Sequence, residues 1–262
     1  MRVDASVTMD VERAGRLATC IAATAPGLEE TLRVYGPGGV EVPVEDLRTG
    51  GGRVLVVEVP TGDVDLSYVA TVCRDPGAAR RVTREEELAY LRPSRYCPSD
   101  LLGGIAVGEI GVAGPKQTAF AVEQWLNANL SYVPGSTDSA DDALHPLLSR
   151  AGVCRDFAHL GVSLCRALGV PARYTAVYAP GLDPMDFHAV YEAAIDGAWY
   201  VFDGTRMAPR PGLLRIASGR DAADTALLTS LGALVRSTSH SLIVTTADDL
   251  PDDDRNALET LA

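Results

Sequence analysis

The fold is decided by the stretch GVCRDFAHLGVSLCRALGVPARYTAVY (152–178). It predicts a helix over residues 155–168, because Gly169 followed by Pro171 is a strong C-terminal stop signal, and a strand comes directly after it. Cys154 stands at the start of this helix, where unpaired backbone N–H groups and the positive end of the helix dipole stabilise a thiolate. The same N–H groups can hold an oxyanion, so the position suits a cysteine nucleophile.

One face of the predicted helix is polar. At 100° per residue, four side chains fall within about 80° of one another: Arg155, His159, Ser163 and Arg166. We expect this stripe to face solvent and Cys154 to face inward, so His159 is interpreted as a solvated surface histidine. Cys165 lies on nearly the same face as Cys154 but about 16 Å farther along the helix, too far for a disulfide, and is expected in the core.

A hairpin in FHAVYEAAIDGAWYVFD (187–203) supplies a candidate base. Asp196-Gly197 is a strong signal for a two-residue turn, and the register it sets makes His188 and Asp203 diagonal neighbours on one face of the sheet. A carboxylate beside the ring fixes its tautomer and stabilises the imidazolium, while the other ring nitrogen can meet a thiol. The residues alone leave two interpretations open: a catalytic pair, or an ordinary sheet histidine followed by a turn aspartate.

Residues 1–75 predict a small antiparallel β domain, interpreted as a sandwich. Turn signals separate four candidate strands, at 18–25, 31–36, 53–60 and 65–73. The chain breaker Asp75-Pro76-Gly77 marks the expected boundary to a catalytic domain over residues 76–262.

The second domain carries further helix signals. Apolar spacing and capping residues predict helices at 84–91, 116–130 and 138–150, the last capped by Ser139. The tail predicts a helical stretch over 221–235, followed by a strand near 239–246. Together with the hairpin, these elements predict an α+β fold.

Composition limits the classes of partner. With 262 residues, of which 47% are hydrophobic and 22% charged, the chain can bury a sizeable core without disulfides or a structural metal. The net charge of −12 argues against a nucleic acid or an anionic membrane as partner, because phosphate binding needs clustered Lys and Arg. No run approaches the ~18 apolar residues of a membrane span. The acidic, polar start is unlike a secretory signal, so a cytoplasmic location is expected.

No metal and no other cofactor is expected. The five cysteines have irregular spacing and are interpreted as reduced thiols rather than a disulfide framework. His145, Cys154, His159 and Cys165 match no common zinc-ligand spacing. The acidic segment DDLPDDDR (248–255) is interpreted as a solvated tail rather than a calcium-binding loop.

The segment 152–178 also resembles the signature around the nucleophile of the transglutaminase-like superfamily, which opens with G-V/Q-C and ends in G-I/V-P-A-R before a strand. The segment 187–203 is similar to the histidine and aspartate elements that follow in these proteins. The resemblance covers residues from about 90 to 220, and the N-terminal β domain is similar to the accessory domain of many bacterial members. It implies a papain-like core, in which the nucleophile helix packs on an antiparallel sheet.

By this resemblance Cys154 is the nucleophile, His188 the general base and acid, and Asp203 the carboxylate that orients the histidine. Tyr132 and Gln124 are both candidate donors to an oxyanion, and spacing does not choose between them. The sequence departs from the common H-A-W and D-P-T patterns, with a valine after His188-Ala189 and a glycine after Asp203. Neither departure removes a catalytic side chain, but both bear on the substrate channel.

The resemblance implies an enzyme that attacks a peptide or carboxamide carbonyl and forms a thioester. Water then gives hydrolysis, as in a cysteine peptidase or amidase, and an amine gives transamidation, as in a transglutaminase. We expect hydrolysis, because cross-linking demands an additional acceptor site. The competing class is a non-catalytic scaffold of the same fold. The expected partner is a peptide, protein or small amide substrate, with no nucleic acid and no membrane.

Overall fold

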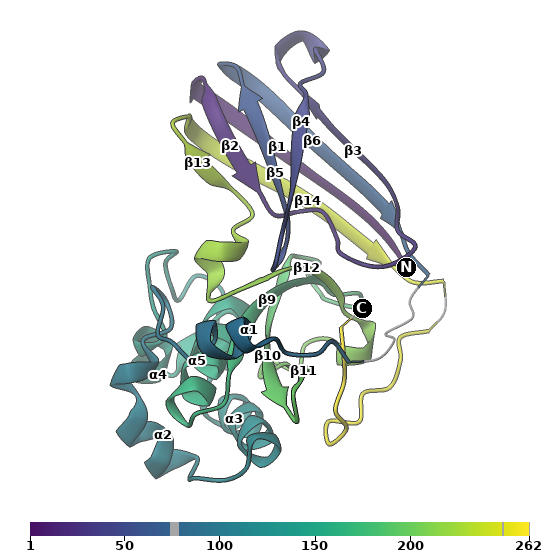
Figure 1. Ribbon diagram of the computed structural model, residues 1–262. Coiled ribbons are helices and arrows are strands. Elements are labelled where there is room, and N and C mark those ends of the chain that lie inside the picture. Colours follow the sequence, from purple (N-terminus) through teal and green to yellow (C-terminus); the bar gives the residue numbers. More distant parts are fainter. Residues whose placement is uncertain (74–78, 248, 262) are drawn as a thin grey trace.

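The computed structural model describes residues 1–73, 79–247 and 249–261. A β-sheet part and a mixed part of helices and strands lie at opposite ends of the molecule (Figure 1). The predicted boundary at Asp75-Pro76-Gly77 falls outside the described residues, so the division into 1–75 and 76–262 stays a prediction. None of the helices in the described ranges is long and apolar enough to cross a membrane.

The β part consists of two sheets that enclose one core. The first has the strand order β14-β1-β6-β3 and comprises β1 (Arg2–Arg13), β3 (Glu29–Tyr35), β6 (Gly62–Thr71) and β14 (Leu234–Thr245). The second contains β2 (Gly15–Thr19), β4 (Val44–Thr49), β5 (Gly52–Val59) and β13 (Thr229–Leu231). Alternate residues of β1 enter the core, as expected for a strand with one buried face: Val3, Ala5, Val7, Met9 and Val11.

The C-terminal region of the chain completes this β part. β14 pairs antiparallel with β1 along almost its whole length, and β13 pairs with β2 (Figure 1). The predicted helical stretch over 221–235 is therefore wrong beyond a short 3-10 turn at Ala222–Thr225. Pairing with strands from the other end of the sequence outweighs the local helical preference, and that pairing leaves no local signal.

The mixed part is built on an antiparallel sheet with the order β11-β10-β9-β12. Its strands are β9 (Ala172–Tyr178), β10 (His188–Ile195), β11 (Ala198–Phe202) and β12 (Leu214–Gly219). A single pair, Ala217 with Gly52, continues this sheet into β5 of the β part. The two parts of the molecule are therefore joined by hydrogen-bonded sheet.

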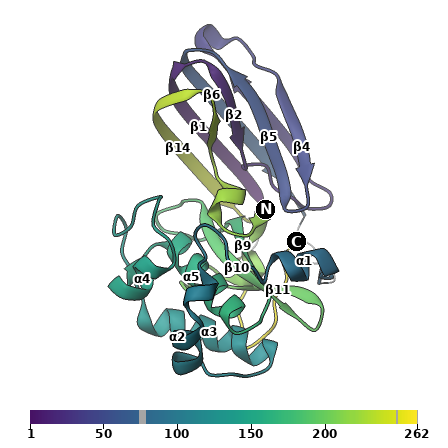
Figure 2. The ribbon, with the colours of Figure 1, turned by 60° about the vertical axis from the view of Figure 1, so that its left-hand side comes forward.

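Helices cover one side of this sheet. α2 (Gly103–Glu109), α3 (Pro115–Asn129), α4 (Leu144–Ser149) and α5 (Cys154–Ala167) gather there, while α1 (Arg84–Ala89) lies near β11 (Figures 1 and 2). α5 packs directly on β9 and β10 and is buried on almost every side. At the closest approach a Cβ on Gly161 would lie 2.6 Å from the Tyr191 ring, so only glycine fits there. This arrangement is the predicted α+β, papain-like core.

The hairpin register was predicted correctly as far as the ladder runs. Ile195 lies opposite Ala198 and Tyr191 opposite Phe202. Asp196 and Gly197 both have positive φ, 51° and 74°, as a type I′ turn requires. β11 ends at Phe202, so Asp203 lies just beyond the ladder, in the loop that follows it.

The predicted helix over 138–150 is shorter in the structure. α4 begins at Leu144, and Ser139 does not cap it. Turns precede the helix instead, in which the side chains of Asp141 and Asp142 accept hydrogen bonds from backbone N–H groups. Pro146 lies in the first turn of α4, where its missing N–H group disrupts no helical hydrogen bond.

Candidate active site

Cys154 is the first residue of α5 and is half-buried. The helix start is fixed by Asp156, whose Oδ2 accepts hydrogen bonds from the Val153 N–H (2.8 Å) and the Thr137 hydroxyl (2.6 Å). Arg155 pairs with the same carboxylate at 3.1 Å and with Thr137. These contacts hold the start of α5 in place, so that Cys154 lies in the first turn, where backbone N–H groups lack a partner four residues earlier in the helix.

His188 and Asp203 meet as the hairpin predicted. The Nε2 atom of His188 lies 3.0 Å from Oδ2 of Asp203, and both side chains are buried. The other carboxylate oxygen, Oδ1, accepts hydrogen bonds from the backbone N–H and the hydroxyl of Thr205. Both oxygens of Asp203 thus have a hydrogen-bond partner, which fixes the carboxylate and holds the His188 ring in one orientation.

The ionisation of His188 and that of Asp203 influence each other. Burial alone would lower the pKa of His188, but the Asp203 carboxylate and a hydrogen bond with Cys154 raise it to about 10. Burial alone would raise the pKa of Asp203, but His188 and then Thr205 lower it below its usual value. The pair therefore favours a protonated His188 beside an ionised Asp203, with the Cys154 thiol next to the ring.

Glu123 was missed by the sequence analysis. It is fully buried on α3, and its Oε1 accepts a hydrogen bond of 2.9 Å from the backbone N–H of Asp203. Burial raises the pKa of this carboxyl group. The signal was present in the sequence, because Glu123 occupies an apolar face of the predicted helix together with Ala119, Val122 and Leu126.

The structure separates the two candidate oxyanion donors. Tyr132, on the short strand β7 (Ser131–Tyr132), lies close enough to Cys154 for the two groups to interact electrostatically. Burial and the negative charge of Cys154 raise the pKa of Tyr132 to about 12, so the hydroxyl keeps its proton. Gln124 is exposed on α3, next to the buried Val122 and Glu123. The geometry favours Tyr132 as the donor.

The expectation that the polar stripe of α5 faces solvent is wrong. His159, Ser163 and Arg166 are each at most 4% exposed. Segments from elsewhere in the chain cover this face, and Arg166 donates hydrogen bonds to the carbonyl oxygens of Arg92, Ala172 and Arg220. Helical periodicity identified a polar face correctly. It could not show that backbone carbonyl oxygens from other segments would accept the hydrogen bonds of this face.

His159 itself is a buried support for the site. Its Nε2 accepts a hydrogen bond from the Ala222 N–H (3.1 Å), and its ring lies between those of Tyr96 and Tyr174. Burial lowers the pKa of His159 to about 4, which keeps the ring neutral and able to accept. Since Ala222 lines the active-site cavity, His159 fixes part of the cavity wall. Cys165 is fully buried, as expected.

A cavity of about 560 Å³ opens at Cys154 and His188. Its wall is largely apolar, with side chains from β9, the residue before β10, β12 and the segment after Ala222–Thr225: Ala176, Phe187, Ile216, Leu227 and Leu228. In the described parts of the chain, no three His, Cys, Asp or Glu side chains lie close enough to hold a metal ion. Because its wall is largely apolar, the cavity can receive an extended, partly apolar group next to the Cys154 thiol.

Comparisons with known proteins agree with this geometry. Residues 107–204 match the family described as the Transglutaminase-like superfamily. The crystal structure called "a Putative Cysteine Protease from Cytophaga hutchinsonii" is 33% identical, with a TM-score of 0.83 over 99% of this chain and 95% of that one. A protein of Mycobacterium leprae, called uncharacterized, is 30% identical over 148 residues, so the chain spans about half of that relative, 53% of each sequence. The chain belongs to the transglutaminase-like superfamily, a family of cysteine-based enzymes.

Proposed function

We propose that the protein is a cysteine hydrolase that cleaves a peptide or carboxamide bond through a thioester, with Cys154, His188 and Asp203 as its catalytic triad. The observation that carries the proposal is the placement of His188, which hydrogen-bonds to Asp203 and lies close enough to Cys154 for the two side chains to interact. The same arrangement recurs in cysteine and serine hydrolases of unrelated fold.

The proposed reaction has two halves. The Cys154 thiolate attacks the carbonyl carbon, and the oxyanion accepts hydrogen bonds from N–H groups at the start of α5 and from the Tyr132 hydroxyl. His188 gives its proton to the leaving amine, and a thioester remains on Cys154. Water then attacks the thioester while His188 takes one of its protons, and the thiolate leaves. The free acid is released and the initial charge state is restored.

The test of this function is incubation with a peptide and carboxamide library, with and without a primary amine, followed by mass spectrometry. We expect products with a new free carboxyl group in both conditions, and none with a Cys154→Ala variant. Products that carry the amine in place of the leaving group would make the protein a transamidase instead. The same triad serves both reactions, so only the acceptor separates them.

A non-catalytic scaffold predicts a different thiol chemistry. If the protein is an enzyme, iodoacetamide at about pH 6.5 will alkylate Cys154 at least about tenfold faster than the exposed Cys73, because α5 and His188 stabilise the thiolate. Peptide mapping of a time course gives both rates within one sample. The other three cysteines are buried, and burial raises their pKa values, to about 11 for Cys20 and about 12 for Cys97 and Cys165. Equal rates at Cys73 and Cys154 would favour the scaffold.

A further inference from the structure

A second cavity, of about 780 Å³, lies behind the catalytic sheet. Strand β9 separates it from the active site, because successive side chains of a strand point to opposite faces. Tyr174 and Ala176 line the active-site cavity, whereas Arg173 lines the second one. The catalytic reaction proposed above uses nothing in this second cavity.

The second cavity gathers arginines in a chain of net charge −12. Five line it, two from the β part and three from the mixed part: Arg48, Arg53, Arg80, Arg173 and Arg215. Four carboxylates pair with four of them: Glu30 and Asp46 with Arg53, Glu86 with Arg80 and Arg173, and Glu192 with Arg173 and Arg215. Arg48 forms no ion pair with any described residue, so among the described residues the five arginines outnumber the four carboxylates that pair with them.

One buried donor in this wall lacks an acceptor. The Arg173 side chain is 1% exposed, stacks on the Trp199 ring at 4.3 Å, and donates from Nε to Glu192 at 2.8 Å. Its Nη2 atom makes no hydrogen bond within the described chain. A buried donor without a partner costs about 1–3 kcal/mol. Nη2 has almost no accessible surface, so an anionic oxygen from the cavity would reach it and supply the acceptor once a neighbouring side chain such as Arg80 moves aside.

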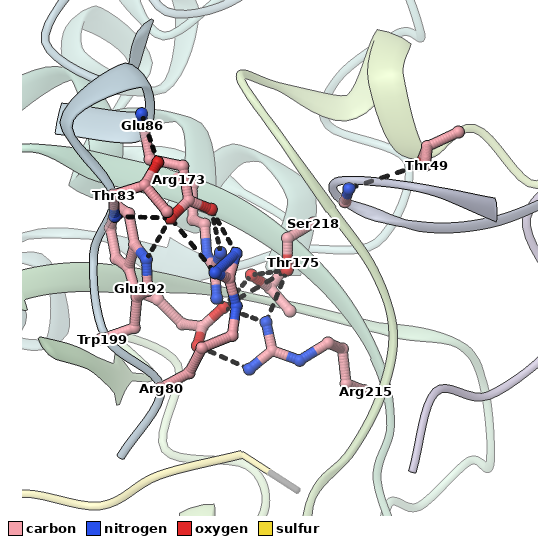
Figure 3. A network of polar contacts seen from close by, with 11 residues as sticks. Thr49, Arg80, Thr83, Glu86, Arg173, Thr175, Glu192, Trp199, Arg215 and Ser218 are labelled. Atoms are coloured by element: carbon pink, nitrogen blue, oxygen red, sulfur yellow. Dashed lines mark hydrogen bonds and ion pairs between the residues drawn. The ribbon is translucent and has the colours of Figure 1, made fainter. Parts of the chain in front are cut away.

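Three positively charged side chains lie close together in this part of the cavity wall. Figure 3 shows Arg80, Arg173 and Arg215 converging there, with Glu86 and Glu192 between and beside them. Burial and the neighbouring charges of Arg173 and Arg215 lower the pKa of Arg80, although Glu86 pairs with it. A bound anion would offset this repulsion, and the partly exposed Arg80 side chain can adjust to it.

We propose that this cavity is a binding site for an oxyanion, the carboxylate or phosphate group of a small molecule, held by Arg48, Arg80 and Arg173. Guanidinium groups present flat, forked donors that match both kinds of anion. The donors approach from β4, from the segment before α1 and from β9, so one ligand would connect the two parts of the molecule.

The test is isothermal titration of the full-length protein at low ionic strength with inorganic phosphate and, separately, with succinate, against matched sodium chloride. We expect saturable binding of one or both anions. The Arg48→Gln and Arg80→Gln variants should each weaken it about tenfold or more, equivalent to about 1.4 kcal/mol. Arg236→Gln is the matched control, because Arg236 is exposed on β14 and pairs with Asp10 outside the cavity. Its affinity should equal that of the unmodified protein.

The two anions distinguish a phosphate ligand from a carboxylate ligand. Binding of phosphate alone assigns a phosphate ligand, and binding of succinate alone assigns a carboxylate. No saturable binding of either anion on the order of 10 mM would overturn the proposal. So would affinity that survives in both arginine variants, or affinity that disappears when Cys154 is alkylated, since the anion would then sit in the active-site cavity.

Discussion

An Asp203→Asn variant should lose about 10³–10⁴-fold in kcat/KM while keeping its fold. The amide has nearly the shape of the carboxylate and can still accept the hydrogen bonds from Thr205, but it carries no charge. The carboxylate contributes most to the raised pKa of His188. Without it the imidazolium is less stable and the favoured tautomer changes, a loss of about 4–5.5 kcal/mol in transition-state stabilisation. Steady-state kinetics on the substrate found by mass spectrometry measure the effect.

A second measurement distinguishes the loss of charge from a loss of structure. In Asp203→Asn the pH at which Cys154 becomes reactive toward iodoacetamide should rise, because its imidazolium partner is weaker. Thr205→Val is the matched control, since it removes one hydrogen bond to Asp203 and leaves the charge. It should lower kcat/KM about tenfold or less. An Asp203→Asn variant that keeps a tenth of the activity would contradict the role proposed for this residue.

Sequence reasoning found those features of the site that are determined by residues close together in the chain. The Asp196-Gly197 turn fixes the hairpin register through backbone conformation alone. Gly169 and Pro171 end α5, and the position of Cys154 at its start follows from the same pattern. These elements are determined by residues close in sequence, so the pairing of His188 with Asp203 could be predicted without a structure.

The part that was missed depends on contacts between distant segments. β14 pairs with β1 across more than 200 positions of sequence, and no local pattern encodes that partner. The polar stripe of α5 illustrates the same limit. A buried polar face and a solvated one have the same periodicity, and only contacts from distant segments, such as the Ala222 N–H that His159 binds, distinguish them. The second cavity also joins residues from both parts, so no local pattern in the sequence brings its arginines together.

Glu192→Gln should lower the free energy of unfolding by about 3–5 kcal/mol. Glu192 is fully buried on β10 and accepts hydrogen bonds from Arg173 (2.8 Å), Arg215 (2.7 and 2.8 Å) and Thr175 (2.8 Å). An amide has no charge to offer two buried guanidinium groups and presents N–H groups to one of them. Urea unfolding near neutral pH measures the loss. Asp10→Asn is the matched control, because Asp10 pairs with the exposed Arg236, and it should cost under about 1 kcal/mol.

The difference in the free energy of unfolding between the unmodified protein and Glu192→Gln should depend on pH, which tests its electrostatic origin. Burial would raise the pKa of Glu192, but Arg173 and Arg215 hold it far below the ordinary value of 4.5. A group with a depressed pKa in the folded state stabilises the fold above its unfolded pKa, and that contribution is lost as the pH falls. The gap between the unmodified protein and Glu192→Gln should therefore stay constant near neutrality and shrink steadily below about pH 4.5. A gap that widens in acid would contradict the ion-pair explanation. The strand concerned begins at His188, so a loss of this network should reduce activity along with stability.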